Sequence, residues 1–385
     1  MSAGREGHAP DRPHLLLVGG GHAHIQVFHD WLREPPDARV TLLVDRPEAL
    51  YSGMVPGFVA GQYSQDELSF DLASWAARIG AELVVDRAEG IDVEGRQVLR
   101  SGGAPLSFDV CSFNIGSTVH GLDVPGVRAH ALSTRPIAVF VEQVVPALRD
   151  AIARRVGQRL HVLVVGGGAA GVELALCLQA RARAEGAPDV AVSLVCASPE
   201  LLPGSVNADG LRRRVEQEFQ RRHIEAHCDE AVIEVRADEV ALESGETLPA
   251  DLVVWATGAA PHLPGHDSSQ AADLGGWIPV GPTLQHVEHP DVFAVGDCAR
   301  LVDHPSTPKA GVYAVRQGPV LAHNLRARLA GRDDLQGYEP QADFLTLLNL
   351  GDGRAVGAKW GFAFRGRWVL RLKDRIDRAF MTRFR

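Results

Sequence analysis

Two glycine-rich turns are the features of this sequence that could carry chemistry. The first lies in the segment His14–Phe28 and the second in Leu160–Leu176, and each combines an apolar run, a glycine turn and a helix-like stretch. Such a turn lets the backbone approach a pyrophosphate, and the helix that follows attracts the anion to its N-terminus. Two turns predict two bound dinucleotides, and a protein that holds two dinucleotides most simply passes electrons between them.

The first glycine turn is followed by an acid that could bind a ribose, but it lacks the third glycine of the usual fingerprint. Gly19 and Gly21 allow close backbone approach, and the helix that begins near His22 offers free N–H groups. Asp45 ends the next predicted strand, where an acid accepts the ribose hydroxyls. His24 replaces the third glycine, which should loosen the packing of helix on strand. Taken alone, the motif also fits a glycine turn in an unrelated α/β protein.

The second turn has complete spacing but lacks its ribose acid. Gly166, Gly168 and Gly171 match the GxGxxG pattern. The strand that follows ends near Cys196, whose thiol accepts a ribose hydroxyl poorly, and the next acid is Glu200. No arginine follows at once to hold a 2′-phosphate. The choice between NADH and NADPH is therefore weakly specified, with a slight preference for NADH.

Histidine and cysteine positions argue against a metal site. His22 and His24 form an HxH pair without a third ligand nearby, so turn and packing roles are expected for them. The sequence has five cysteines, at positions Cys111, Cys177, Cys196, Cys228 and Cys298. No two are close in sequence, which argues against a local redox motif and favours a reducing, cytoplasmic compartment. A pair assembled from distant cysteines stays open.

Composition limits the partners of the chain. Its 385 residues allow two or three domains, and a hydrophobic content of 45% is ordinary for a globular protein. The net charge of -9 argues against nucleic acid as a partner, because phosphate binding needs a basic face. No apolar stretch approaches the ~18 residues that span a bilayer. The polar segment Met1–Arg12 predicts a disordered tail rather than a secretory signal.

The surrounding pattern predicts the elements that position these turns. The apolar runs predict strands at His14–Val18, Arg39–Val44, Ala81–Val85, Phe108–Ile115, His161–Val165, Val190–Val195, Leu252–Thr257 and Val292–Val295. The periodic segments predict helices at Asp71–Ile79, Ile137–Arg154, Ala169–Ala184, Leu211–Arg222 and Ala310–Ala330. Ala231–Leu248 reads as an antiparallel meander and Tyr51–Gly61 as a loop.

Together these features resemble the two-dinucleotide flavoproteins, the pyridine nucleotide-disulfide oxidoreductase family that includes type II NADH dehydrogenases. The strand ending in Gly296-Asp297 and the turn Ala256-Thr257-Gly258 supply two further fingerprints in the family's order, over about residues 13 to 330. The stretches GGGHAH, YSGMVPG and KDRIDRAFMTRF resemble one branch more closely. That branch is the flavoprotein module that occurs alone or fused ahead of selenophosphate synthetase.

The resemblance implies an α/β fold with two Rossmann-like dinucleotide-binding domains. The FAD domain would span 12–135 and 279–335, split by an NAD(P)H domain at 136–278 and followed by a small C-terminal cap at 336–385. The implied cofactor-binding residues are Gly19, Gly21, His22, Ala23, His24, Asp45, Arg46, Ser52, Gly53, Met54, Gly116, Ser117, Gly166, Gly168, Gly171, Thr257, Gly258, Gly296, Asp297 and Ala310.

Three residues acquire catalytic roles from the same resemblance. Lys309 would lie near the pyrimidine edge of the flavin, where a cation stabilises the anionic reduced form. Tyr313 falls in the segment that lines the quinone pocket of type II dehydrogenases. Glu173 matches a glutamate on the nicotinamide side of the flavin, although it could also be an ordinary helix acid. Lys309 could likewise be a solvated surface lysine.

The expected activity is therefore that of an FAD-dependent NAD(P)H dehydrogenase. FAD would take hydride from NAD(P)H, and a second acceptor, of which a quinone is one candidate, would receive the electrons. Two alternatives stay open: a sulfide- or selenide-oxidising flavoprotein, and a non-catalytic flavin-bound redox sensor.

The C-terminal segment, rich in arginine and aromatic residues, has three candidate partners. Val369, Leu372, Ile376 and Phe380 fall on one predicted helix face. That face is expected to pack on the protein's own core or on a homodimer mate. The alternative is peripheral contact with an anionic membrane, at its inner face.

Overall fold

The computed structural model describes residues 12–204, 208–262 and 276–384. The expected disordered tail thus lies outside the described residues, except for Arg12. The chain divides into two compact units, each assembled from separated stretches of sequence. Unit 1 comprises Met1–Ala49, Asp71–Gly116 and Pro261–Pro340, and unit 2 comprises Leu50–Phe70, Ser117–Ala260 and Gln341–Arg385.

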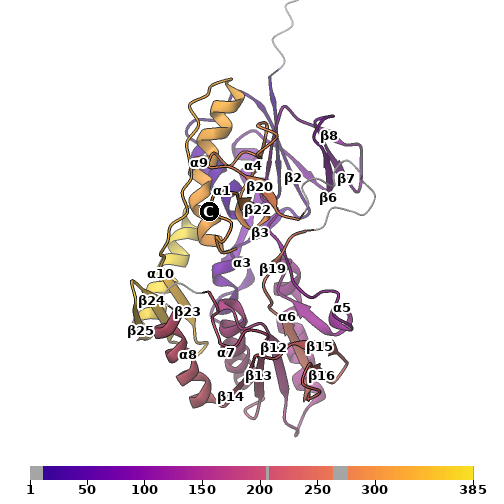
Figure 1. Ribbon diagram of the computed structural model, residues 1–385, viewed down its shortest axis with the longest axis vertical. Coiled ribbons are helices and arrows are strands. Elements are labelled where there is room, and N and C mark those ends of the chain that lie inside the picture. Colours follow the sequence, from indigo (N-terminus) through magenta and orange to yellow (C-terminus); the bar gives the residue numbers. More distant parts are fainter. Residues whose placement is uncertain (1–11, 205–207, 263–275, 385) are drawn as a thin grey trace, which may run out of the picture. The chain divides into compact units, whose positions relative to one another are not determined.

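Unit 1 is built on a five-stranded parallel sheet in the order β21-β9-β1-β2-β5. Its strands are β1 (His14–Val18), β2 (Arg39–Val44), β5 (Glu82–Val85), β9 (Val110–Phe113) and β21 (Val292–Ala294). Strands β1 and β9 are buried along their whole length because helices and loops cover both faces of such a sheet. Helix α1 (His22–Trp31) lies along α9 (Gly311–Leu329), and the Trp31 indole N–H donates to the Ala322 carbonyl, 3.4 Å away (Figure 1).

Smaller elements complete unit 1. They are α4 (Leu72–Arg78), the antiparallel set β6 (Ala88–Asp92), β7 (Gln97–Arg100) and β8 (Leu106–Ser107), the parallel pair β20 (Ile278–Val280) and β22 (Ala299–Leu301), and the 3-10 turn η3 (Gly296–Cys298). The strand-turn-helix predicted at the first glycine turn is confirmed, and so are the predicted β2 and the helix at Asp71–Ile79 to within a residue.

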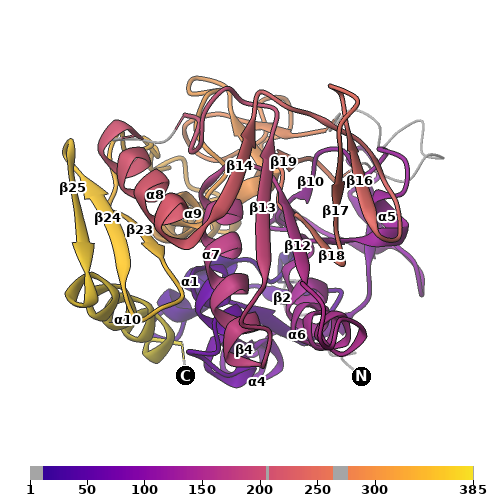
Figure 2. The ribbon, with the colours of Figure 1, turned by 90° about the horizontal axis from the view of Figure 1, so that it is seen from below.

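Unit 2 contains a second five-stranded parallel sheet, in the order β11-β18-β12-β13-β14 (Figure 2). Its strands are β11 (Ala131–Ser133), β12 (His161–Val165), β13 (Ala191–Cys196), β14 (Ile224–Cys228) and β18 (Leu252–Trp255). Its helices include α5 (Val127–His130), α6 (Ile137–Arg154), α7 (Ala169–Ala184) and α8 (Ala208–Arg222). The antiparallel pieces are β10 (Thr118–Val119), β19 (Ala259–Ala260) and the meander β15 (Val232–Val235), β16 (Glu239–Leu242) and β17 (Thr247–Pro249). Two parallel Rossmann-like sheets confirm the predicted fold class.

The C-terminal segment belongs to unit 2, although its composition sets it apart in the sequence. It forms β23 (Thr346–Asn349), β24 (Ala355–Lys359), β25 (Phe362–Gly366) and helix α10 (Arg367–Thr382). Helix α8 lies beside β24 and β25 (Figure 2). The buried Glu218 carboxylate on α8 fixes this arrangement, because it accepts from Arg354 at 3.1 Å and from Arg365 at 2.6 Å.

The predicted loop at Tyr51–Gly61 is wrong, because most of it is helical. It contains η1 (Ser52–Met54) and α2 (Val55–Val59), next to the short elements β3 (Glu48–Leu50), α3 (Gln65–Leu68) and β4 (Ser69–Asp71). Pro56 stands in the first turn of α2, where a missing N–H costs nothing. Val55 and Val59 are buried, and α2 packs on α6 and α7. Tertiary burial thus overrides the loop character of a segment rich in glycine and proline.

The predicted apolar face of α10 is only partly confirmed, since Val369 is buried and Phe380 stacks on Tyr51 with the ring centres 4.5 Å apart. The buried positions are Val369, Lys373, Asp377 and Met381, whereas Ile376 is exposed. Lys373 and Asp377 form an ion pair of 2.8 Å one helical turn apart. The Lys373 ammonium also donates to the Gly53 carbonyl at 2.7 Å, and the Tyr51 hydroxyl donates to Asp377 at 3.3 Å. The helix therefore clamps the η1 segment through polar contacts that a hydrophobic pattern does not show.

This clamp gives a first prediction, for Lys373→Met. The substitution leaves the Asp377 carboxylate buried without its cation, so we expect the free energy of unfolding to fall by about 3 kcal/mol. Arg378→Met is the control on the same helix, because Arg378 is exposed and surface ion pairs contribute about 0–1 kcal/mol. Urea unfolding followed by circular dichroism measures both. Equal losses in the two variants would show that the buried pair has no special role.

Candidate functional site

The first glycine turn is shaped by the end of the neighbouring strand β9. Gly19 has φ +93°, and a Cβ there would lie 2.5 Å from the Asn114 carbonyl oxygen. Gly21 precedes α1, and a Cβ there would lie 2.3 Å from Asn114 Oδ1. Only glycine fits at either position, so the turn is held close to the strand.

Asn114 is the residue that organises this turn, and the sequence reasoning missed it. Its side-chain oxygen accepts from the backbone N–H groups of Ala23 (3.0 Å) and His24 (3.3 Å), which caps α1 in place of a side chain at Gly21. Its amide nitrogen donates to the Val295 carbonyl at 3.0 Å. The only sign of this role in the sequence is that a polar residue directly follows a buried strand.

His24 tightens the turn, contrary to the expectation that it loosens the packing. Its Nδ1 lies 2.7 Å from the Gly19 carbonyl and its Nε2 lies 3.0 Å from Ser112 Oγ. A carbonyl can only accept, so Nδ1 carries the proton and Nε2 accepts from the serine. Burial lowers the pKa of His24 to about 4, so the ring is neutral near pH 7. Within the described ranges, no three His, Cys, Asp or Glu side chains gather in a way that could hold a metal ion.

Two acids flank the N-terminus of α1 in unit 1. Asp45 is exposed directly after β2, and Arg46 follows it. Asp297 lies in η3, close enough to His22 to oppose the burial that lowers the pKa of that imidazole to about 4. The N–H of Gly296, whose φ is +69°, donates to Gln317 Oε1 at 2.6 Å. Two carboxylates near a helix N-terminus suit the hydroxyl groups of a bound dinucleotide, so these residues fit FAD.

The predicted acceptor-side residues gather around a narrow hollow that Asp297 also lines. The Lys309 ammonium donates to the Ala299 carbonyl and lies 4.2 Å from the centre of the Trp277 ring. Burial lowers the pKa of Lys309, and the Asp297 carboxylate opposes that shift. Ala310 caps α9, and Tyr313 is buried in its first turn.

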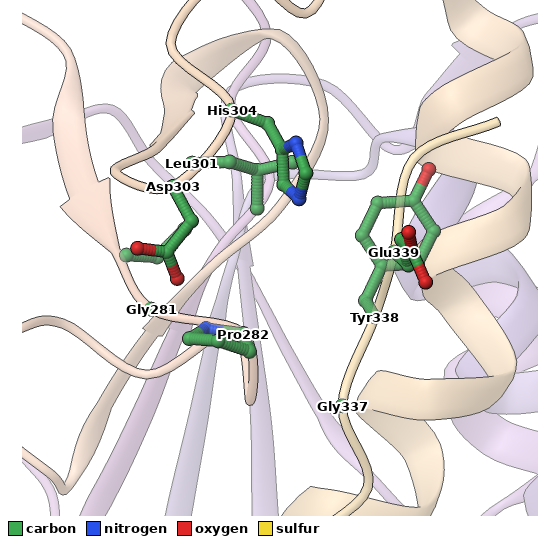
Figure 3. Close-up of a pocket in the computed structure, with 9 residues that line it drawn as sticks. Gly281, Pro282, Leu301, Asp303, His304, Gly337, Tyr338 and Glu339 are labelled. Atoms are coloured by element: carbon green, nitrogen blue, oxygen red, sulfur yellow. The ribbon is translucent and has the colours of Figure 1, made fainter. Parts of the chain in front are cut away.

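A larger cavity of about 330 Å³ adjoins this hollow and shares Leu301 and His304 with it. Figure 3 shows Asp303 and His304 on one side and Tyr338 and Glu339 on the other. None of the predicted site residues lines it. The cavity therefore does not identify the dinucleotide site.

In the second glycine turn, packing within the protein requires two of the three glycines, and only a bound ligand requires the third. A Cβ at Gly166, where φ is +123°, would lie 2.3 Å from the Ala256 carbonyl oxygen, and one at Gly171 would lie 1.9 Å from the Gly166 carbonyl oxygen. A Cβ at Gly168, which caps α7, would meet no described atom within 4 Å. Packing does not require glycine at 168, whereas close approach of a pyrophosphate does. The turn therefore fits NAD(P)H.

The strand after this turn ends without a carboxylate aimed at a ribose. Cys196 ends β13, and the Glu200 carboxylate pairs with Arg212 at 2.6 Å. Thr257 and Gly258 follow β18; the Thr257 hydroxyl donates to the His120 carbonyl at 2.7 Å. The end of β13 therefore specifies neither NADH nor NADPH.

The other predicted residues have structural contacts of their own. Gly53 in η1 is held by α10, and Ser52 and Met54 are its neighbours. Gly116 has φ +71° and Ser117 accepts from Arg135. The buried Glu173 carboxylate accepts from the Asn349 N–H at 2.6 Å, and burial raises its pKa to about 7. In unit 1 the structure brings together the first turn, Asp297 and the Lys309 hollow; the second turn and Glu173 lie in unit 2.

Two Rossmann-like sheets, each followed at its glycine turn by a helix, define a flavoprotein that binds two dinucleotides. The sequence pattern of the pyridine nucleotide-disulphide oxidoreductase family matches residues 13–318, so the chain belongs to that family. It is an FAD-dependent oxidoreductase that takes hydride from NAD(P)H and passes electrons to a second acceptor.

Individual relatives cover almost the whole chain. Human ferroptosis suppressor protein 1 is 27% identical over 378 residues, which are 94% of this chain and 93% of the relative. Demethylphylloquinone reductase NdbB from Synechocystis is 24% identical over 87% of this chain and 85% of its own. NDH2 from Plasmodium falciparum, solved with NADH, superimposes with a TM-score of 0.81 over 97% of both chains at 14% identity.

Proposed function

We propose that the chain is an NAD(P)H:quinone oxidoreductase. The binding of NAD(P)H is supported by one observation, the open space beside Gly168 at the N-terminus of α7. Its similarity to demethylphylloquinone reductase supports a quinone as the acceptor. The FAD domain would span 12–135 and 279–335, the NAD(P)H domain 136–278 and the cap 336–385. The motifs GGGHAH and KDRIDRAFMTRF support placing the chain in the branch that also occurs fused to selenophosphate synthetase.

Bound FAD supplies the hydride acceptance and the electron transfer. In this proposal the N-terminus of α1 binds its pyrophosphate, and Asp45 and Asp297 bind its hydroxyl groups. Lys309 places a cation at the flavin, because Asp297 and the Ala299 carbonyl hold its ammonium in a partly dry hollow. Tyr313 presents an apolar ring to the acceptor. Glu173 positions the Asn349 turn, which its buried hydrogen bond supports.

The proposal is tested by following flavin absorbance without oxygen. NADH or NADPH should bleach the flavin, and a water-soluble ubiquinone analogue should restore the oxidised spectrum. Tyr313→Ala should slow the second step at least fivefold and leave the first unchanged. Sulfide that bleaches the flavin in place of NAD(P)H would instead establish the sulfide-oxidising alternative. Reduction without reoxidation by any quinone would favour the redox sensor.

A surface of unit 2 supports contact with an anionic membrane. Trp360 and Phe362, at the turn between β24 and β25, are 73% and 76% exposed. The Lys359 ammonium lies 4.2 Å from the centre of the Trp360 ring. Aromatic residues beside cations are the pattern of interfacial anchors. No helix in the described part of the chain is long and apolar enough to cross a membrane. We propose peripheral attachment at the cytoplasmic side through this hairpin.

A vesicle-binding measurement tests this attachment. The double substitution Trp360→Ser/Phe362→Ser should weaken sedimentation with phosphatidylglycerol vesicles about tenfold. Val156→Ser removes an apolar side chain that is 81% exposed elsewhere in unit 2, and it should have no effect. The homodimer alternative predicts that the double variant halves the mass seen by light scattering while vesicle binding is absent from the start.

A further inference from the structure

Two cysteines that are distant in sequence meet at the end of the second sheet. Cys196 ends β13 and Cys228 ends the adjacent parallel strand β14, and the two residues are register partners. Their Sγ atoms are 3.4 Å apart. Both are free thiols: Cys196 is buried and Cys228 is half-buried. Partner positions on neighbouring strands are close enough for a disulfide, whose Cα atoms are typically ~4.4–6.8 Å apart.

This thiol pair also contacts the nucleotide turn. A methyl group at Gly167, the middle glycine, would lie 2.8 Å from Cys196 Sγ, so the sulfur packs directly on the turn. The Gly167 carbonyl accepts from the Leu202 N–H at 2.7 Å, and the Cys196 thiol donates to the Ser198 carbonyl at 3.5 Å. The segment after β13 is therefore tied to both the turn and the thiol. It is also the place where a dinucleotide-binding fold contacts the adenosine ribose.

We propose that Cys196 and Cys228 form a reversible disulfide that weakens NAD(P)H binding. This inference rests on the proposed binding of NAD(P)H at the Gly166–Gly171 turn. The oxidant is a low-molecular-weight disulfide. The Cys228 thiolate attacks it, forms a mixed disulfide and releases one thiol; the Cys196 thiolate then attacks Cys228 Sγ and releases the second thiol. Two protein thiols are thus oxidised by two electrons, and one small disulfide is reduced to two thiols.

Closing the bond must disturb the turn. A disulfide needs its sulfurs at ~2.05 Å, so the pair must approach by more than 1 Å. Cys196 Sγ then leaves its position against Gly167 and loses its hydrogen bond to Ser198. The backbone at Gly167 and Ser198, which faces the pyrophosphate and the ribose, then lacks its contact with the Cys196 sulfur. Neither cysteine belongs to the first glycine turn, Asp45 or Asp297, which bind the pyrophosphate and hydroxyl groups of FAD in the proposed function, so FAD binding should not change.

ADP-ribose is the probe for the test, because it occupies the nucleotide site without redox chemistry. The holoprotein is treated with oxidised glutathione, the Cys196–Cys228 disulfide is identified by mass spectrometry of unreduced peptides, and the Kd is measured by calorimetry. We expect the disulfide to form and the Kd to rise about tenfold, with full recovery in dithiothreitol. Flavin content should stay constant. Cys228→Ser, which retains the other four cysteines, should bind ADP-ribose equally with and without the oxidant.

The possible failures are distinct. If reduced wild-type protein does not bind ADP-ribose, the proposed nucleotide site is wrong and this inference falls with it. If the reduced protein binds but no Cys196–Cys228 disulfide forms, the proposed function stands and the disulfide is refuted. A disulfide that leaves the Kd within twofold, or a Kd change that persists in Cys228→Ser, would equally overturn the inference.

Discussion

Gly168→Val should abolish NAD(P)H binding and leave the bound flavin intact. The valine side chain would extend into the open space at the N-terminus of α7, where a pyrophosphate must approach the backbone. The backbone at Gly168, with φ -71° and ψ 177°, accepts valine without strain. We expect the Kd of ADP-ribose to rise at least 100-fold, which is about 2.7 kcal/mol. Calorimetry measures the Kd, and the visible spectrum measures flavin content.

Gly281→Val is the matched control for that variant. A Cβ at Gly281 also meets no described atom within 4 Å, and its backbone is not left-handed, but Gly281 belongs to unit 1, where it lines the cavity of Figure 3 and is not part of either glycine turn. It should bind ADP-ribose like the wild type. If Gly168→Val also binds normally, no ligand approaches that backbone, and the nucleotide site lies elsewhere.

Asn114→Leu should yield protein that has lost most of its FAD. The leucine has a similar size but leaves the buried backbone N–H groups of Ala23 and His24 without their acceptor. It also removes a donor to the Val295 carbonyl, which keeps the Cys298 thiol as a donor at 3.2 Å. Each N–H group without an acceptor costs about 1–3 kcal/mol, so we expect the free energy of unfolding to fall by about 4 kcal/mol. The first glycine turn then loses the cap that holds it against β9. The flavin-to-protein absorbance ratio after purification measures the loss of FAD.

Asn324→Leu separates loss of the turn from general instability. Asn324 is equally buried in unit 1 and makes three comparable hydrogen bonds: its amide donates to the carbonyls of Thr283 and Gln336, and its oxygen accepts from the Gln336 N–H. It should be destabilised by a similar amount and retain FAD under conditions where both variants are folded. Equal loss of FAD from both would show that Asn114 has no specific role at the flavin.

The sequence alone determined the two sheets and the glycine turns that follow their strands. Residues 40–44 of β2 are buried and apolar except for Thr41, so both the strand and its end before Asp45 are visible in the sequence. Helix α7 occupies the residues expected from its periodicity. The family resemblance likewise rested on such runs and turns. These signals are local, because apolar burial and glycine backbone freedom act within a few neighbouring residues.

Only the tertiary structure decided which side chains support those turns. Asn114 reaches Ala23 across 91 residues, and Cys228 meets Cys196 across 32. Lys373 contributes to a buried clamp, because its partners come from η1 and the next helical turn. A polar side chain carries no local pattern that reveals its partner. Its role depends on which distant atoms the fold brings within hydrogen-bonding distance, and burial then makes that contact energetically decisive.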